Sequence, residues 1–481
     1  MLFLYTNLLL LTVYFYVFGY DIIFNEVYHL KYMQNKGLIF MKTTKKGNKK
    51  KKNNPATIVI LLIIFILVAA YTIFTNFIEF PFSDQFSKAL STLPFYNEDS
   101  EEEQNKEKPD PIHEIEEEEE DKEALIMAAG DVMVHTPQLD QAKTENNNYD
   151  FSPSFEYISD YLENADAAVA NLETTFAGAE RGYSCFPLFN TPDALAHNLK
   201  DAGFDLMCTA NNHSLDMGKE GLFRTIDVLR DAGLKSFGTY QSREERETPL
   251  ILDVNGIDVG FLAYTDSTNA IPIPEGKDYI VNYVGVDNEP SLENAAAIFE
   301  EDIERARDEG ADLVAVYMHW GHEYQFTPHI WQEKLAESLA KAGADMVLGS
   351  HPHVIQPMEF IEIEKDDGTS HEAFVAYSMG NFVSNQHYIP GAIPTEEVKY
   401  GLVLKLHLAK EAETEEAYLD EVEYLLTWVN RDREHQILPL HEAIASEPED
   451  FKIPENKYNR LEPIWNRTLE RLEGFKPAFT P

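Results

Sequence analysis

Short apolar runs that end in polar residues are the feature that most constrains how residues 124–408 can fold. Amphipathic stretches of helical length separate these runs, which predicts an α/β domain with one sizeable core. Loops that follow strands are where such folds place their chemistry. Six runs end in residues that can bind a metal ion, which are, in chain order, Asp131 and His135; Asn171 and Glu173; Asn211, Asn212, His213 and Asp216; His319; His351 and His353; and Asn381.

The fifth of these run ends, Leu-Gly-Ser-His-Pro-His over 348–353, has the clearest ligand pattern. Gly349 lets the backbone turn, and Pro352 fixes the chain between His351 and His353, so two imidazoles project toward one point. Neutral imidazole is a common ligand of Zn, Mn and Fe. A lone His-x-His is also found as two loop histidines in solvent, so the pattern gains its meaning from the other run ends.

Two of the other run ends have a simpler alternative. Asp131 fits a helix N-cap, and the Asn-rich loop 211–216, just before a helix predicted over 219–232, fits a turn. Asn171 and Glu173 point to one side of an extended chain, because side chains alternate along a strand. Six such ends in one domain are better explained by a shared site, so the sequence predicts one metal centre there.

The residues from 41 to 78 predict a membrane anchor. Residues 41–55 are basic, with seven lysines between 42 and 52, and an uncharged apolar run follows within 56–78. About 20 apolar residues suffice to cross a membrane, and flanking lysines stay in the cytoplasm. We therefore expect a single-pass protein of the cell membrane, with a cytoplasmic N-terminus and an extracellular main domain.

The two segments on either side of this anchor are less regular. Residues 1–40 are apolar and aromatic, and they fit either a translated upstream extension with Met41 as the true start or a first membrane segment. Residues 79–123 include fifteen acidic residues and three lysines between Glu98 and Glu123. Such a segment repels itself and predicts a disordered spacer, with a calcium-binding or partner-binding tail as the alternative.

Composition excludes one class of partner. The 481-residue chain has 83 acidic and 39 basic residues and a formal net charge of -44, so nucleic acid is not an expected partner. Two cysteines, Cys185 and Cys208, do not make a disulfide scaffold, and whether they pair stays open. We expect residues 409–481 to pack on the domain as an extension, with a strand over 417–427 and a helix over 462–472.

These run ends together resemble the bacterial capsule-synthesis CapA family, the poly-γ-glutamate capsule proteins, over residues 124–408. The matching motifs are Gly-Asp-Val-Met at 130–133, Asn-Leu-Glu-Thr at 171–174, Ala-Asn-Asn-His at 210–213, His-Trp-Gly at 319–321 with Glu-Tyr at 323–324, Gly-Ser-His-Pro-His at 349–353 and Tyr-Ser-Met-Gly-Asn-Phe at 377–382. More distantly, the chain is similar to calcineurin-like metallophosphoesterases. That similarity implies a β-sandwich flanked by helices, with metals at the strand ends.

The second resemblance implies roles for seven residues. The implied ligands are Asp131 and His353 for a first metal, Asn212, His319 and His351 for a second, and Glu173 as the bridging carboxylate, with His213 as proton donor. The chain departs from the phosphoesterase pattern at two places. His135 follows Asp131 by four residues instead of two, and Glu173 replaces an aspartate, so the expected cofactor is one or two ions of Mn, Zn or Fe.

The resemblance implies a membrane-anchored protein that acts in synthesis, export or processing of an anionic capsule polymer such as poly-γ-glutamate. The expected partners are the polymer, the membrane and subunits of a capsule synthase. An active protein would be a metal-dependent hydrolase. The alternatives are a non-catalytic scaffold that binds the polymer or the synthase, and a metallophosphoesterase on the outer face of the membrane.

Overall fold

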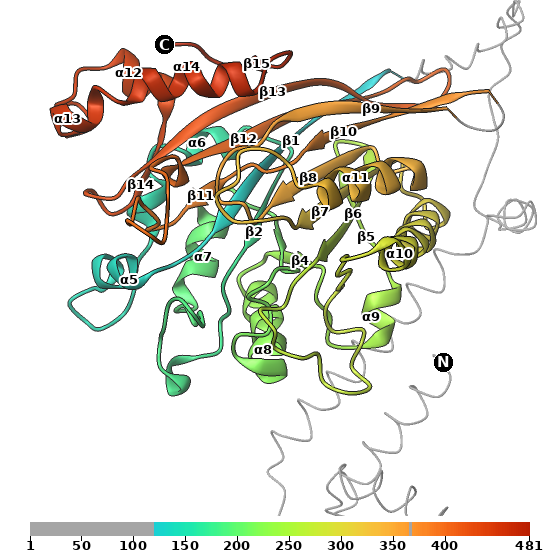
Figure 1. Cartoon of the computed structure of the whole chain (residues 1–481), viewed down its shortest axis with the longest axis horizontal. Helices are drawn as coiled ribbons and strands as arrows, with labels where there is room; N and C mark the ends of the chain where they lie inside the picture. The colour runs from blue at the N-terminus through green and yellow to red at the C-terminus, as the bar shows by residue number, and fades with distance from the viewer. Residues whose placement is uncertain (1–119, 365–367) are drawn as a thin grey trace, which may run out of the picture. The chain divides into compact units, whose positions relative to one another are not determined.

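The computed structural model describes residues 120–364 and 368–481, which form a mixed α/β fold (Figure 1). The predicted extension 1–40, basic segment 41–55, membrane helix 56–78 and most of the acidic spacer 79–123 lie outside these residues. Within the described part of the chain, no helix is long and apolar enough to cross a membrane. The first strand begins at Lys122, two residues before the predicted start of the domain.

The larger sheet has nine strands and combines a parallel half with an antiparallel half. β1 to β4 are parallel to one another, and β12 joins β1 in antiparallel fashion. The order is β14 (Gln436–Pro439), β13 (Ala417–Asn430), β12 (Tyr400–Lys410), β1 (Lys122–Val132), β2 (Ala167–Leu172), β3 (Leu206–Cys208) and β4 (Lys235–Phe237), with β11 (Asn381–Val383) paired to β1 and β15 (Lys476–Pro477) to β13.

The smaller sheet has six strands and is parallel at its centre. β6, β7, β8 and β10 run parallel, and an antiparallel strand closes each edge. The order is β5 (Leu250–Val254), β6 (Ile257–Thr265), β7 (Leu313–His319), β8 (Met346–Ser350), β10 (Ser370–Ala376) and β9 (Met358–Glu364).

The two sheets pack face to face, and alternation of side chains along each strand fills three apolar layers. On β1, Ile126 and Ala128 enter the core between the sheets, whereas Met127 and Ala129 pack on the outer face. The outer face of the larger sheet is covered by α6 (Ser159–Glu163) and α7 (Ala194–Asp201). The outer face of the smaller sheet is covered by α10 (Glu289–Asp308) and α11 (Ile330–Ala342). The predicted mixed α/β fold is confirmed.

The remaining helices connect strands or follow the last long strand. They are α5 (Thr136–Ala142), α8 (Gly218–Asp231), α9 (Arg243–Glu247), α12 (Leu440–Ala445), α13 (Glu455–Tyr458) and α14 (Leu461–Arg471). Residues 409–481 supply β13, β14 and β15 to the larger sheet, and Trp465 of α14 is buried in the same apolar core as Tyr424 of β13. Cys185 and Cys208 are both free thiols.

Candidate metal centre

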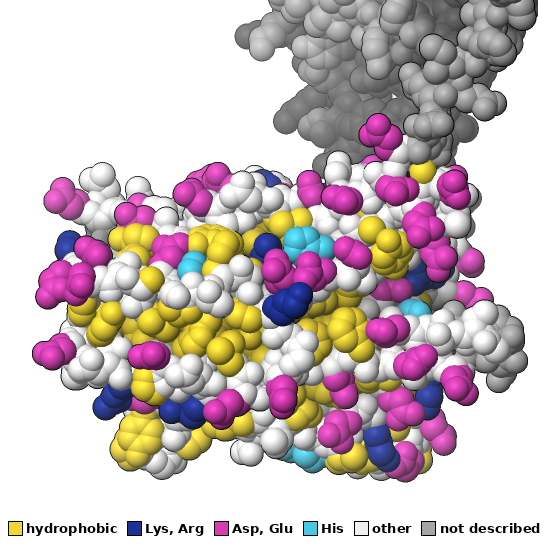
Figure 2. Space-filling view, turned by 90° about the horizontal axis from the view of Figure 1, so that it is seen from above, with side chains coloured by type: hydrophobic (Ala, Val, Ile, Leu, Met, Phe, Trp, Pro, Cys, Tyr) yellow, Lys and Arg dark blue, Asp and Glu magenta, His cyan; other side chains and the backbone are white. Residues whose placement is uncertain are grey.

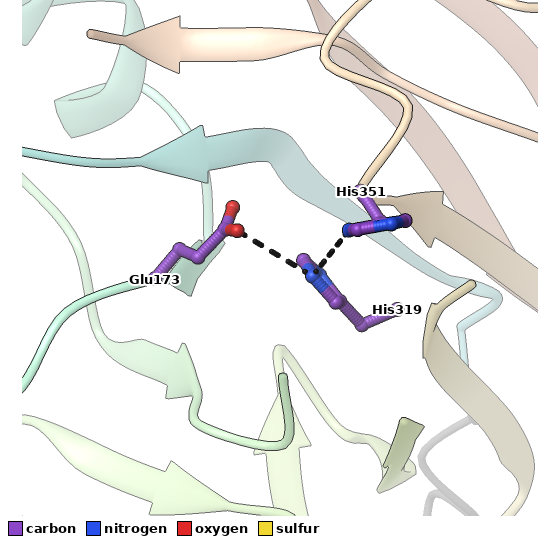
Figure 3. A group of neighbouring side chains, drawn as sticks. All are labelled: Glu173, His319 and His351. Carbon is purple, nitrogen blue, oxygen red and sulfur yellow. Dashed lines mark hydrogen bonds and ion pairs between the residues drawn. The ribbon is translucent and has the colours of Figure 1, made fainter. Parts of the chain in front are cut away.

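The site forms where the carboxyl ends of strands from both sheets meet. Glu173 follows β2, His319 is the last residue of β7, and His351 follows β8. Figure 3 shows these three side chains converging from separate strands, with the two imidazoles and the carboxylate turned toward one another. The carboxyl ends of parallel strands lie at one edge of a sheet. Polar residues that follow such strands therefore meet there, although they are far apart in the sequence.

Close backbone contacts allow this convergence, and they require glycine at two strand ends. A Cβ on Gly130 would lie 1.9 Å from the carbonyl oxygen of Gly380, and a Cβ on Gly349 would lie 2.1 Å from that of Tyr377. Gly130 immediately precedes Asp131, and Gly349 lies two residues before His351. These glycines therefore bring the strands that carry the ligand-type side chains within reach of one another.

The turn after β8 holds both of its histidines in the left-handed region of backbone space. His351 has φ of 96° and His353 has φ of 57°. Residues other than glycine rarely adopt these values, and such strain concentrates at functional sites because the surroundings must hold it in place. The turn therefore orients two imidazoles at an energetic cost.

The first group of possible metal ligands, called a donor group below, surrounds Nε2 of His319. His319 Nε2 lies 3.1 Å from His351 Nδ1, 3.0 Å from Asn212 Oδ1 and 3.5 Å from Glu173 Oε1. Glu173, His319 and His351 each offer a ligand atom, and these atoms all lie within 4.8 Å of one another. The structure thus brings together the residues that the resemblance assigned to the second metal.

The second group is formed by Asp131, Glu173 and His353, again with ligand atoms within 4.8 Å of one another. His353 Nδ1 lies 3.0 Å from Asp131 Oδ2 and 3.1 Å from Asn381 Oδ1, and its Nε2 lies 3.9 Å from Glu173 Oε1. Glu173 belongs to both groups. Its position between them is the one expected for a carboxylate shared by two cations.

Glu173 also provides the test of whether a metal fits. The residue is fully buried, and neither carboxylate oxygen has a hydrogen-bond partner among the described residues. Burial raises its pKa well above the usual value, and the charge of Asp131 raises it further. A buried charge without a partner is costly, and a bound cation would compensate it. The residues present therefore fit a divalent metal.

Two of the histidines, His319 and His351, favour the neutral form that binds metals. Burial holds the pKa of His319 well below its usual value, and burial lowers the pKa of His351 to about 3. Repulsion from neighbouring histidines in their charged form lowers both pKa values further. Neutral imidazole has a free lone pair, which is what a metal ion needs.

A layer of amides and a hydroxyl orients these side chains. Asn171 Nδ2 donates to Asp131 Oδ1 over 2.7 Å and lies 3.2 Å from His319 Nδ1, which Ser350 Oγ also approaches to 3.0 Å. Asn211 Nδ2 in turn donates to Asn171 Oδ1 over 3.1 Å. Donation from His319 Nδ1 to Ser350 Oγ leaves the opposite ring nitrogen free for a metal, and the surrounding contacts fix the ring orientation.

His213 faces Glu173 from the side of β3. Its Nδ1 lies 2.8 Å from Asp216 Oδ2, its Nε2 lies 3.9 Å from Glu173 Oε1, and the ring packs against Phe189 at a centroid distance of 4.7 Å. Asp216 also accepts from the backbone nitrogen of Phe189 over 2.6 Å. The His213 and Asp216 pair can therefore hold a proton at Nε2 toward the site.

His135 lies outside both donor groups. It precedes α5, where its backbone nitrogen donates to Gln138 Oε1, and its Nδ1 accepts from the backbone nitrogen of Asn385 over 3.4 Å. The predicted ligand-type residues otherwise converge: Asp131, Asn171, Glu173, Asn211, Asn212, His213, Asp216, His319, His351, His353 and Asn381 are all buried around one point.

Sequence reasoning missed Asn269, which belongs to the loop after β6. Its Nδ2 lies 3.4 Å from His213 Nδ1, and its Oδ1 accepts from Asn212 Nδ2 over 3.3 Å. The only signal was that β6 runs into Asp266, a further polar residue at a strand end. Asp266 Oδ2 accepts from the backbone nitrogen of Gly321 and thereby joins this loop to the one after β7.

Comparison with known proteins gives relatives with capsule names. The chain is 28% identical over 279 residues to the capsule biosynthesis protein CapA of Bacillus anthracis, which covers 56% of this chain and 61% of that protein. It is 33% identical over 190 residues to the PGA biosynthesis protein CapA of Bacillus subtilis (strain 168), which covers 39% of this chain and 44% of that protein. Each match thus spans less than two thirds of the relative.

Two other matches are more distant. A probable polyglutamine synthesis accessory protein of Mycobacterium tuberculosis (strain ATCC 25618 / H37Rv) is 27% identical over 208 residues, 41% of this chain and 53% of that protein. A crystal structure of a novel phosphatase from Mycoplasma pneumoniae aligns with 63% of this chain and 93% of that chain, at 11% identity and a TM-score of 0.33. That structural likeness is too low to carry an argument.

The family comparison spans the whole metal centre. The family described as bacterial capsule synthesis protein PGA_cap matches residues 125–386, a range that begins within β1 and ends after β11. All the residues of both donor groups fall inside it, and the resemblance to the CapA family is confirmed. Since the match covers more than half of the 481 residues, this chain belongs to the bacterial capsule synthesis protein PGA_cap family.

Proposed function

We propose that this chain is a metal-dependent hydrolase of the metallophosphoesterase type that acts on an anionic capsule polymer such as poly-γ-glutamate, during its synthesis, export or processing. The observation that carries the proposal is the buried Glu173 carboxylate, which lacks a hydrogen-bond partner among the described residues and belongs to both donor groups. The names of the Bacillus relatives supply the capsule context.

Each donor group would hold one ion. Asp131, Glu173 and His353 would hold the first, and the second would be held by Glu173, Asn212, His319 and His351. Bound divalent cations of the Mn, Zn or Fe kind would stabilise the negative charge that develops on the reacting group. Asn171 and Ser350 keep the His319 ring turned toward the site through their contacts with Nδ1.

The chain itself supplies the proton for the leaving group. Asp216 Oδ2 accepts from the Nδ1 of His213 and stabilises the protonated imidazole, whose Nε2 proton faces the site. Transfer of that proton to the departing nitrogen of an amide, or to the departing oxygen of a phosphoester, leaves His213 neutral. A positioned group of this kind contributes about 10²- to 10⁴-fold to a rate.

The surface charge of the protein bears on how it meets a polyanion. Figure 2 shows carboxylates scattered over one face of the molecule, in keeping with a net charge of -44. An anionic polymer is repelled by such a surface unless cations screen or bridge the charges. Cations at the metal centre would attract the polymer to the one place where it is processed.

The proposed location follows from the sequence. Residues 56–78 would anchor the chain in the cell membrane, with the lysines at 42–52 in the cytoplasm and the described domain outside, where a capsule synthase would be its neighbour. Protease added to intact cells should then degrade the domain. Protection of the domain in intact cells, with digestion only after lysis, would contradict this topology.

The test of the metal centre is elemental analysis of the full-length chain purified in detergent. We expect near-stoichiometric Mn, Zn or Fe in the wild type and in His322→Ala, a control at an exposed histidine outside both groups. We expect the metal to be lost in the double variant His351→Ala with His353→Ala. Loaded wild type should then be screened on γ-glutamyl polymers and phosphoesters.

A wild-type protein that holds no metal even after reloading would contradict the hydrolase. The non-catalytic scaffold that binds the polymer or the synthase would then be the better account. Turnover of phosphoesters without any turnover of γ-glutamyl polymers would instead favour a metallophosphoesterase on the outer face of the membrane.

A further inference from the structure

A cationic side chain lies beside the metal centre without an acidic partner. Arg431 follows β13 in the turn to β14, is half-buried, and donates from Nε to Asn385 Oδ1 over 2.9 Å. It forms no ion pair with any residue of 120–364 or 368–481, although the chain has 83 acidic and 39 basic residues. Arg433 of the same turn also forms no ion pair among the described residues, so what distinguishes Arg431 is its contact with Asn385.

The two acidic residues that act electrostatically on Arg431 are engaged elsewhere. Asp432 forms an ion pair with Lys457, and Glu396 forms one with Lys399. Each carboxylate therefore has another cation as its direct partner, and neither forms an ion pair with Arg431. Because a partly buried charge without a counterion is costly, the position favours binding of an anion from outside the chain.

The other neighbours of Arg431 are neutral. His435 Nε2 lies 3.0 Å from the same Asn385 Oδ1, and burial lowers the pKa of His435 to about 3, with a further contribution from the charge of Arg431. His135, which contacts the backbone of Asn385, has a pKa lowered to about 4 by burial. Neither imidazole is charged near neutral pH, so neither competes with Arg431 for an incoming anion.

A two-residue segment joins Arg431 to the metal centre. Asn385 contacts Arg431, and the next residue, Gln386, accepts through Oε1 from Asn381 Nδ2 over 3.0 Å. Asn381 Oδ1 in turn lies 3.1 Å from His353 Nδ1. Asn385 therefore contacts the guanidinium, and the next residue, Gln386, contacts Asn381, which lies against His353.

We propose that Arg431 binds a carboxylate of the anionic polymer next to the unit that occupies the metal centre. The proposal rests on the proposed function for the identity of the polymer. Guanidinium is planar and always charged, and it pairs with a carboxylate through two parallel hydrogen bonds. A γ-linked glutamate chain carries one free carboxylate on every unit. A subsite beside the metal centre would therefore meet a free carboxylate whichever unit of the polymer occupies the centre.

The test is equilibrium binding of a γ-linked glutamate oligomer to the full-length chain in detergent, by calorimetry at two salt concentrations. We expect Arg431→Gln to weaken binding about ten- to a hundredfold, as for loss of a hydrogen bond to a charged group. Arg431→Lys should recover only part of this, because an ammonium cannot pair bidentately. The control is Arg433→Gln, which removes the same charge from the same turn and should leave binding unchanged.

Stability separates a local effect from misfolding. Without ligand, Arg431→Gln should melt close to the wild type, because removal of an unpaired charge offsets loss of the hydrogen bond to Asn385. The oligomer should raise the melting temperatures of the wild type and of Arg433→Gln more than that of Arg431→Gln. Equal binding by wild type and Arg431→Gln, equal weakening by Arg433→Gln, or no binding by the wild type would overturn the proposal. Binding of inorganic phosphate through Arg431 without binding of the oligomer would also overturn it.

The proposed function can fail separately. Metal content and hydrolysis are measured on the same wild-type sample, and Arg431→Gln should keep its metal, since Arg431 is in neither donor group. A wild type that binds the oligomer through Arg431 but holds no metal would refute the hydrolase and leave the carboxylate site standing.

Discussion

His351 Nδ1 lies 3.1 Å from His319 Nε2, and the pKa of both imidazoles is lowered by burial. Asn212 Oδ1 approaches the same His319 nitrogen to 3.0 Å, and Glu173 Oε1 lies 3.5 Å from it. One proton cannot satisfy all these acceptors at once. The set of atoms is better explained as lone pairs directed at one cation.

Glu173→Gln should have opposite effects with and without metal. In chelator we expect the variant to have a higher free energy of unfolding than the wild type at neutral pH, because the substitution removes a buried carboxylate without partners. In excess metal we expect a lower value, because a ligand is lost. Free metal at a concentration of about 100 to 1,000 times its dissociation constant adds about 3 to 4 kcal/mol to the free energy of unfolding of a protein that binds it.

In chelator, the gain in the free energy of unfolding of Glu173→Gln over the wild type depends on pH. The pKa of Glu173 is raised in the folded state, so its protonated form supports folding fully below the unfolded value near 4.5 and loses that effect as pH rises toward the folded value. Denaturant unfolding in chelator at pH 5 and 7.5 should therefore show the larger difference at pH 7.5. Equal differences, or the same shift in the control Glu180→Gln, would contradict the assignment.

His435 should make the protein sensitive to acid. Its pKa is lowered from 6.5 to about 3 by burial, so the unfolded state takes up a proton that the folded state does not as pH falls below 6.5. This costs about 2 kcal/mol of stability between pH 7 and pH 5. The variant His435→Gln should lose less stability over that interval, whereas the exposed control His197→Asn should behave as the wild type does.

Gly130→Ala should destabilise the protein severely. The new Cβ would lie 1.9 Å from the carbonyl oxygen of Gly380, and backbone atoms cannot move aside as a flexible side chain can. We expect a loss of at least about 3 kcal/mol, at the upper end of overpacking effects, with loss of metal binding. Gly182→Ala is the control, since nothing lies within 4 Å of its Cβ and only its φ of 75° is unfavourable. Thermal unfolding that affects both variants equally would contradict the prediction.

Asp216→Asn should reduce turnover without releasing metal. Asp216 contacts His213 and lies in neither donor group. We expect kcat on any substrate turned over by the wild type to fall by about 10- to 100-fold. Elemental analysis should give the wild-type metal content. A variant that loses both metal and activity would show a structural role instead.

The sequence predicted the fold class and the convergence of the site because both depend on local rules. Apolar runs gave strands, and helices predicted over 219–232 and 462–472 correspond to α8 at Gly218–Asp231 and α14 at Leu461–Arg471. Polar residues at the ends of parallel strands must meet at one edge. This is why Glu173, His319 and His351 were found together, although they are far apart in the chain.

The features that the sequence did not reveal depend on loops and on distant pairings. Asn269 reaches His213 only because an irregular loop folds back over the site, and no periodic pattern marks such a path. His135 is held at the start of α5, where Pro137 in the first turn favours helix initiation. That proline was a local signal for its position. Arg431 becomes relevant only through Asn385, a contact between a strand turn and a distant loop.

The pairing of β1 with β12 has a consequence for the order in which the molecule is completed. Lys122 pairs with Lys410 and Ala129 with Val403, so the strand that carries Asp131 gains one neighbour from the beginning of the domain and another from near its end. Closing so long a loop slows folding, because its entropic cost is met before the contacts form. The strand that carries Asp131 must therefore wait until residues 403–410 have been synthesised before it gains its second long neighbour.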